Sequence, residues 1–376
     1  MLSATLLSAM LSPAPCLPAA PDARATRTCA ATCAAQAEPA RNGEDAQRGD
    51  KRTERGFTMP TFGIQIGDLV DHTFSSPLHN GLGTHSLDDL RGKPVMIDFW
   101  GVRCHGCIAA AVPSALKLQE TFGDELQVIL VECQASSPEA AIAFALGQKW
   151  LGGRAMWTSE RPFDTGSGSL PQCVLLDREG HVLLKGNPTA LHKEIERQIA
   201  AQIELGQSPP PDADPVARPA WSEFARGRYA RAFRAAGEAE AQHAGDPARL
   251  AELARARAAF RARLVKRIER VRWLADNAWY DEADSALDTL AAGLRGSGEH
   301  AACLAELRTK LADPKLAVDR SAARHLARLR ARFYESGGDA AAVRELERFA
   351  KEHAKSQTGE RALELVRLAG DVKSAR

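Results

Sequence analysis

The stretch "WGVRCHGC", residues 100–107, decides how this chain folds. It follows the apolar run "VMIDF", residues 95–99, which is typical of a buried β-strand. Cys104 and Cys107 have CxxC spacing, so they could exchange electrons, hold a metal or lie in a turn. A strand that delivers Cys104 to the first turn of a helix sets its sulfur against unpaired N–H groups and the positive end of the helix dipole. This geometry favours the thiolate of Cys104 and lets Cys107 resolve a mixed disulfide.

A metal site is the weaker interpretation of the two cysteines. A closed zinc site needs four ligands at recurring spacings, and a second CxxC is missing. The nearest candidates, Cys29 and Cys33 in "CAATC", lie in a stretch without the apolar residues of a core. We therefore predict no metal and no cofactor other than the disulfide itself.

Composition limits the function classes. The chain has 376 residues, enough for roughly two or three domains, and its 49 Lys and Arg balance 48 Asp and Glu. Such a balance gives no basic field for nucleic acid. No stretch beyond the N-terminus approaches 18 apolar residues, so we expect membrane contact only through that end.

The N-terminal residues divide into two predicted segments. Residues 1–23 are uncharged up to the final aspartate and modestly apolar, which suggests a signal or anchor segment, although the basic n-region is missing. A start codon placed too far upstream of a cytoplasmic protein, or a signal whose basic residues are absent, would explain the same pattern. Residues 24–59 carry few large apolar side chains, and we interpret them as a disordered linker.

The rest of the chain predicts an α/β domain followed by an all-α region. Over residues 60–204, strand-like runs alternate with helical spacing and end in a hairpin across "REG", which indicates a central mixed sheet flanked by helices. Residues 205–219 form a Pro-rich linker. Residues 220–376 are rich in Ala, Arg, Leu and Glu and contain three loosely similar turns, "FARGRYARAF", "ADNAWYDEAD" and "YESGGDAAAV". These resemble the helical hairpins of tetratricopeptide-type repeats, although their spacing is irregular.

The stretches "GKPVMIDFWGVRCHGC" and "SLPQCVLLDREGHVLLKGNP" resemble the thioredoxin superfamily, specifically its TlpA/ResA-like thiol-disulfide oxidoreductases. The resemblance covers about residues 62–203. It implies a thioredoxin fold, with Cys104 as nucleophile and Cys107 as resolving thiol. Asp98, six residues before Cys104, would be the buried acid that accepts and returns the proton of Cys107. Pro171 would be the cis-proline that presents Leu170 to the client.

The chain departs from this family in three places near the cysteines. Arg103 stands where the family usually has Trp, and a cation there favours the thiolate and a more oxidising couple, unless solvent screens it. His105 and Gly106 replace the usual intervening pair, and a protonated His105 would act in the same direction. Pro113 follows Cys107 by six residues rather than five, which predicts a bulge or a shifted kink in the helix. The predicted client-binding residues are Trp100, Arg103, His105, Leu170 and Pro171.

Two further cysteines and the C-terminal aromatic residues receive structural interpretations. Cys173, where relatives more often have Thr, is a small buried residue or, as the alternative, a third redox thiol. Cys133 is expected to pack. The aromatic residues at helix turns, such as Trp273 and Trp279, are also expected to pack, with a ligand groove as the alternative for them.

Together these features predict an enzyme that reduces, or alternatively forms, disulfides in protein clients. Its partners would be dithiol or disulfide clients, an upstream redox donor and a protein bound by the helical region. The rival interpretation is a non-catalytic interaction protein with a degenerate thioredoxin-like module. A metallochaperone would leave Asp98 and Pro171 without a purpose. We expect an exported protein of the periplasm or cell envelope, with the cytoplasm as the alternative.

Overall fold

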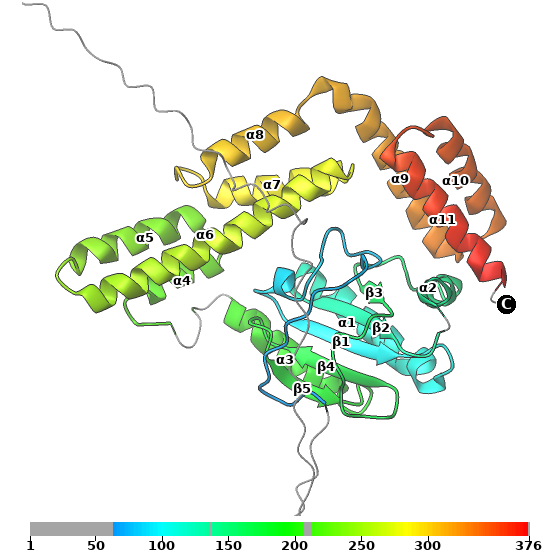
Figure 1. Ribbon diagram of the computed structural model, residues 1–376, viewed down its shortest axis with the longest axis horizontal. Helices are drawn as coiled ribbons and strands as arrows, with labels where there is room; N and C mark the ends of the chain where they lie inside the picture. The colour runs from blue at the N-terminus through cyan, green and yellow to red at the C-terminus, as the bar shows by residue number, and fades with distance from the viewer. Residues whose placement is uncertain (1–62, 136, 207–208, 210–212, 375–376) are drawn as a thin grey trace, which may run out of the picture. The chain divides into compact units, whose positions relative to one another are not determined.

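The computed structural model describes residues 63–135, 137–206, 209 and 213–374, which belong to one compact unit. The predicted segments 1–23 and 24–59 lie outside the described residues. The helices and strands are those marked in Figure 1.

A five-stranded mixed sheet forms the first part, in the order β3-β2-β1-β4-β5 (Figure 1). Its strands are β1 (Val95–Trp100), β2 (Gln127–Glu132), β3 (Met156–Thr158), β4 (Gln172–Leu176) and β5 (Val182–Gly186). β1, β2 and β3 run parallel, whereas β4 runs antiparallel to β1 and to β5. All residues of β1 and β2 are buried, as their continuous apolar runs predict for strands covered on both faces. The β4–β5 hairpin is the one predicted across "REG".

Helices connect the strands and supply the covering layers. They are a π-helical turn η2 (Cys107–Ala111) that leads into α1 (Val112–Phe122), then α2 (Pro138–Gly147) and α3 (His192–Gly206). Met96, Trp100 and Leu175 pack with residues of α1 and α3, whereas Ile97 and Val174 belong to a second apolar cluster on the other face of the sheet. This confirms the predicted α/β thioredoxin fold.

The second part is all-α, also as predicted. Its helices are α4 (Arg218–Ala225), α5 (Tyr229–Gln242), α6 (Pro247–Asp276), α7 (Tyr280–Gly293), α8 (Ala301–Leu311), α9 (Ala317–Ser336), α10 (Ala340–Glu352) and α11 (Gln357–Ser374). The three similar sequence turns are the connections α4–α5, α6–α7 and α9–α10. With α6 spanning 30 residues, the helices differ too much in length for a regular repeat, and the tetratricopeptide-like interpretation stays a prediction.

The three turns share one backbone motif. In each, an N–H bonds to the carbonyl five residues earlier: Arg228 to Glu223, Trp279 to Leu274, and Gly338 to Phe333. The residue before each donor has a positive φ: 72° at Gly227, 56° at Ala278 and 70° at Gly337. This is the Schellman ending of a helix, which satisfies its last carbonyls through a left-handed residue.

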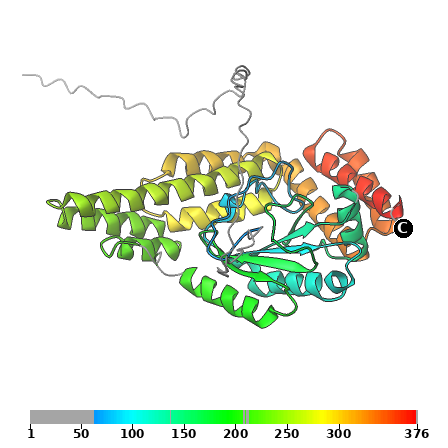
Figure 2. The same ribbon diagram turned by 60° about the horizontal axis from the view of Figure 1, so that its bottom comes forward.

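The α/β part and the helical part share a hydrophobic core. One cluster of buried side chains contains Trp157 and Leu146 together with Phe333, Leu346 and Phe349 of α9 and α10. Helices α2 and α11 pack against each other, as both views show (Figure 1, Figure 2). The predicted borders of the linker, 205 and 219, fall inside α3 and α4.

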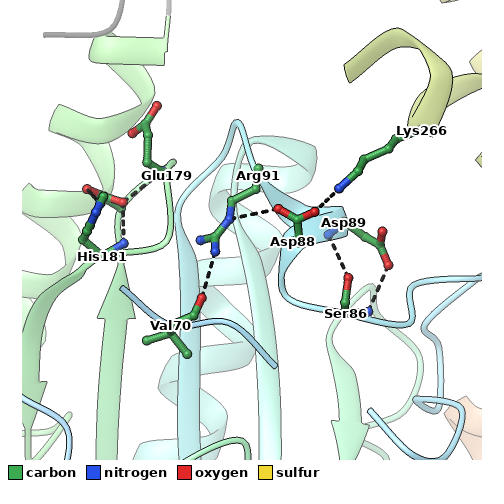
Figure 3. Close-up of polar contacts among 9 residues, drawn as sticks. Val70, Ser86, Asp88, Asp89, Arg91, Glu179, His181 and Lys266 are labelled. Carbon is green, nitrogen blue, oxygen red and sulfur yellow. Dashed lines mark hydrogen bonds and ion pairs between the residues drawn. The ribbon is translucent and has the colours of Figure 1, made fainter. Parts of the chain in front are cut away.

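Polar contacts also join the two parts near the short helix η1 (Asp88–Leu90). The Asp88 carboxylate contacts Lys266 of α6 and also pairs with Arg91, at 3.5 Å (Figure 3). Arg91 in turn donates a hydrogen bond to the carbonyl of Val70 at 2.8 Å. Arg270 donates to the hydroxyl of Thr84 at 2.9 Å.

Candidate active site

Cys104 and Cys107 lie at the end of β1, where the chain turns into the helix, and they form a disulfide with their Cα atoms 5.2 Å apart. Cys107 is fully buried, whereas Cys104 is half-buried. The backbone N–H of Cys107 donates to Sγ of Cys104 at 3.2 Å. A hydrogen bond to the sulfur favours its charged form, so the accessible cysteine is also the one whose thiolate is stabilised.

The helix after Cys104 begins with a π-helical turn. The N–H of Val112 bonds to the carbonyl of Cys107, five residues earlier, and Pro113 follows at the start of α1. Proline has no N–H to donate. The hydrogen-bond pattern therefore changes from π to α at a position where a regular α-helical hydrogen bond would be missing anyway. The bulge predicted from the late position of Pro113 is therefore present.

Asp98 lies in the middle of β1 and is completely buried. Neither carboxylate oxygen has a hydrogen-bond partner among the described residues. Burial raises the pKa of Asp98 well above its ordinary value, because the charged form loses its hydration. Side chains alternate along a strand, so Asp98 shares a face with Met96 and Trp100, which pack in the same cluster as Cys107. Asp98 is therefore on the side of the sheet that holds the buried sulfur.

Pro171 comes directly before β4, and the Leu170–Pro171 peptide bond is cis, as expected. A Cβ built on Gly106 would lie 3.7 Å from Cδ of Pro171, so the proline is next to the CxxC turn. Pro171 is buried and Leu170 is half-buried. The role that the family resemblance implies for Leu170 stays a prediction.

Arg103 and His105 flank Cys104 and are both exposed. The Arg103 side chain extends to the carbonyl of Gln134, at 3.5 Å. Solvent screens a cation in this position, which removes most of the oxidising influence that Arg103 would otherwise have on the thiol. Both residues are accessible to a client.

Trp100 differs from the other predicted client-binding residues because its side chain is fully buried. Its ring contacts Phe144, Trp150 and Trp157, with centroids 5.8–5.9 Å apart. A client cannot touch this indole while the sheet is intact. The prediction that Trp100 binds clients is therefore wrong. Side chains alternate along β1, so Trp100 lies on the same face of the sheet as Met96 and packs in the core beneath the site.

Glu132 and Gln134 support the site and escaped prediction. The buried Glu132 carboxylate accepts backbone N–H groups of Val102 at 3.1 Å and of Gln134 at 2.8 Å. The side-chain carbonyl of Gln134 accepts the N–H of Arg103 at 3.0 Å. These bonds fix the loop that leads to Cys104. A charged residue at the end of the apolar run "VILVEC" was the available signal, since buried carboxylates need partners.

The two other cysteines of this region lie close to the site. Cys173 faces Asp98 across the β1–β4 pair and is buried, and its burial raises the pKa of its thiol. Cys133 is half-buried and lines a small cavity of about 270 Å³ together with Leu170 and Arg161. Burial raises the pKa of Cys133 as well, so both thiols stay protonated and unreactive at neutral pH.

The described part of the chain has neither a cluster of metal-ligating side chains nor a membrane-spanning helix. No three His, Cys, Asp or Glu side chains in the described ranges gather closely enough to hold a metal ion. No helix there is long and apolar enough to cross a membrane.

No protein-family model and no curated protein matches this chain. Solved structures that it resembles include a candidate protein disulfide isomerase from Bacteroides thetaiotaomicron, at 22% identity and a TM-score of 0.33, over 39% of this chain and 96% of that one. A candidate thiol:disulfide interchange protein DsbE from Chlorobium tepidum matches at 25% identity and a TM-score of 0.31, over 37% and 99%. A thiol-disulfide isomerase from Corynebacterium glutamicum matches at 19% identity and a TM-score of 0.30, over 36% and 97%.

Proposed function

We propose that this protein is a thiol-disulfide oxidoreductase that reduces disulfides in protein clients. The observation that carries the proposal is the asymmetry of the Cys104–Cys107 pair: one sulfur is accessible and accepts a backbone hydrogen bond, and the other is buried. A buried, unpartnered Asp98 on the same side of the sheet adds the proton acceptor that the buried sulfur requires.

The reaction consists of two exchanges between sulfurs. The Cys104 thiolate attacks a client disulfide, forms a mixed disulfide and releases one client sulfur as a thiolate. Cys107 then gives its proton to the Asp98 carboxylate and attacks Sγ of Cys104, which releases the second client sulfur. The client gains two electrons, and the enzyme ends with the Cys104–Cys107 disulfide. A separate dithiol donor must return two electrons before the next turnover.

The reducing direction rests on the family resemblance and on the exposure of Arg103. A screened cation beside Cys104 stabilises the reduced form little, which leaves no local cause for a strongly oxidising couple. We place the protein in the cell envelope because of its apolar N-terminal stretch. The helical part would bind a protein partner.

A trapping experiment tests the exchange. In the full chain, Cys107→Ser leaves Cys104 able to attack but removes the group that resolves the intermediate. This variant should accumulate a mixed disulfide with an oxidised model client, such as insulin, that dithiothreitol releases. Cys104→Ser is the matched control and should form no mixed disulfide at the CxxC turn, because Cys107, the thiol that remains there, is buried.

The interaction-protein alternative predicts a different result. If the module were degenerate, Cys107→Ser and Cys104→Ser would behave alike and neither would hold a client. Equal and negligible trapping by both variants would therefore refute the enzyme.

A further inference from the structure

A cavity of about 730 Å³ lies away from the cysteines. Its walls come from the loop 77–82, the start of α2, the α6–α7 turn, and helices α9 and α11. Ligand pockets typically have volumes of about 300–1,000 Å³, so this cavity has room for a small organic molecule.

Two arginines in this cavity share one indole ring. The guanidinium carbons of Arg330 and Arg361 lie 4.5 and 4.3 Å from the ring centroid of Trp279. The Arg330 guanidinium forms no ion pair or hydrogen bond with any residue that the structure describes. Arg361 donates to the carbonyl of Ala278 at 3.0 Å, but its buried Nε has no partner in the described chain. Among the described residues, the Arg330 guanidinium therefore has only the weak attraction of the aromatic ring, and that of Arg361 has the ring and one carbonyl.

No carboxylate of the described cavity wall forms an ion pair with either of these two arginines. Asp281 is already paired with Arg324, at 3.0 Å. Glu139, Glu360 and Glu364 are exposed, where water screens their charge. The half-buried Glu282 and the exposed Glu364 favour the charged form of Arg361, but neither forms an ion pair with its guanidinium.

Burial next to a second cation also lowers the pKa values of basic groups in this cavity. Burial and the neighbouring Arg330 lower the pKa of Arg361 to about 10. The same two causes lower the pKa of His79 to about 4, so this imidazole is neutral at pH 7. Its Nε2 lies 3.1 Å from the hydroxyl of Tyr334. An incoming anion would relieve the repulsion between the arginines.

We propose that this cavity binds a small organic dianion, a phosphate monoester or a dicarboxylate, whose charged oxygens lie between Arg330 and Arg361. Guanidinium groups suit both anions because their planar donors match two oxygens at once. The organic part would contact the apolar side chains of the wall, Ile142, Leu326 and Leu368. A bare phosphate ion would leave most of the volume empty.

Titration calorimetry on the full chain tests this site. Phenyl phosphate serves as the phosphate probe and isophthalate as the dicarboxylate probe, with chloride adjusted to constant ionic strength. We expect at least one probe to bind saturably at one site with a dissociation constant below about 1 mM. The uncharged isophthalamide should not bind.

Substitutions locate the binding. Arg330→Gln should weaken the affinity at least about tenfold, as expected for the loss of a charged hydrogen-bonding partner. Arg330→Gln removes only the contact of this guanidinium with the Trp279 ring, so the variant should fold normally, whereas Arg361→Gln also removes the hydrogen bond to Ala278. Arg328→Gln, at an exposed arginine of the same helix that lies outside the cavity, is the matched control and should bind like the original chain.

Two results would overturn the proposal: no saturable binding of either probe, or equal affinity in Arg330→Gln and Arg328→Gln. Neither depends on thiol exchange, so failure of this proposal and failure of the oxidoreductase are distinguishable.

Discussion

At the scale of single residues, the chemistry depends on three groups with unequal access to water. Cys104 is half-buried, Cys107 is fully buried, and Asp98 is buried without a partner. An unpartnered buried acid costs folding free energy, because its charged form cannot be hydrated. The cost is understandable if the acid serves proton transfer rather than stability.

Replacing Asp98 with Asn should therefore stabilise the protein while it slows exchange. The pKa of Asp98 is raised in the folded state, so the folded chain keeps its proton at pH values where the unfolded chain has lost it. The free energy of unfolding accordingly falls as the pH rises from the pKa of Asp98 in the unfolded chain to its pKa in the folded chain. The fall is about 1.4 kcal/mol for each pH unit between these two pKa values. In urea unfolding, the free energy of unfolding of Asp98→Asn relative to that of the original chain should be larger at pH 8 than at pH 4.

The Asp98→Asn variant must also lose rate in the second exchange step, measured as slower release of the mixed disulfide. A variant that is more stable yet equally fast would show that the carboxylate takes no part in the reaction.

The sequence revealed some of these residues and concealed others. The CxxC spacing is a local pattern, whereas the roles of the acid inside "MIDFW" and of the proline before "QC" were inferred from the family resemblance. Glu132 and Gln134 act on Val102 and Arg103, some 30 residues away along the chain, and only the pairing of β1 with β2 brings them together. No local pattern encodes such a contact.

At the scale of elements, the long and strongly patterned segments were predictable. The buried strands β1 and β2 follow from their short continuous apolar runs, and the 30-residue helix α6 follows from apolar residues at helical spacing. β3 was missed because three residues, Met156–Thr158, are too few to show any period. The π-helical turn was found only because Pro113 stood one position later than the family has it.

The helix turns offer a test of backbone energetics. Ala278 takes the left-handed conformation that glycine takes in the other two turns. That conformation costs an L-residue about 1–2 kcal/mol, and glycine loses about 0.5–1 kcal/mol more entropy on folding than alanine does. Ala278→Gly should thus stabilise the chain by about 0.5–1 kcal/mol in urea unfolding.

Gly227→Ala is the reverse change in the equivalent position of the first turn. A Cβ there would lie 3.9 Å from the Tyr229 hydroxyl, an ordinary contact, so only the backbone conformation is tested. It should destabilise the chain by a similar amount. If both substitutions shifted stability in the same direction, the shared turn motif would not explain either.

At the scale of the whole molecule, the sequence indicated two parts but not their common core. The sequence of an amphipathic helix indicates which face is buried, but not which other element packs against that face. Buried Phe333, Leu346 and Phe349 pack in one cluster with Leu146 and Trp157 of the α/β part. The helical part is therefore integral to the fold of the described chain.

Removal of the helical part should weaken the α/β part. A chain that ends at Gly206 would leave Leu146 and its neighbours without cover, and burial of one large apolar side chain is worth about 1.5–3 kcal/mol. We expect the urea midpoint of the sheet to fall by an amount equivalent to at least about 3 kcal/mol, with new binding of a hydrophobic dye. An unchanged midpoint would mean that the shared core contributes little.

The measurement that tests the central claim most directly is a redox titration of the full chain. The fraction of Cys104–Cys107 disulfide would be followed by alkylation mass shift across graded dithiothreitol and glutathione buffers, with Cys104→Ser as control. We predict a single two-electron transition with a midpoint of about −270 mV, that of a reductase. A reversible transition at about −120 mV would reverse the direction, and the absence of a reversible disulfide at any potential would contradict the enzyme itself.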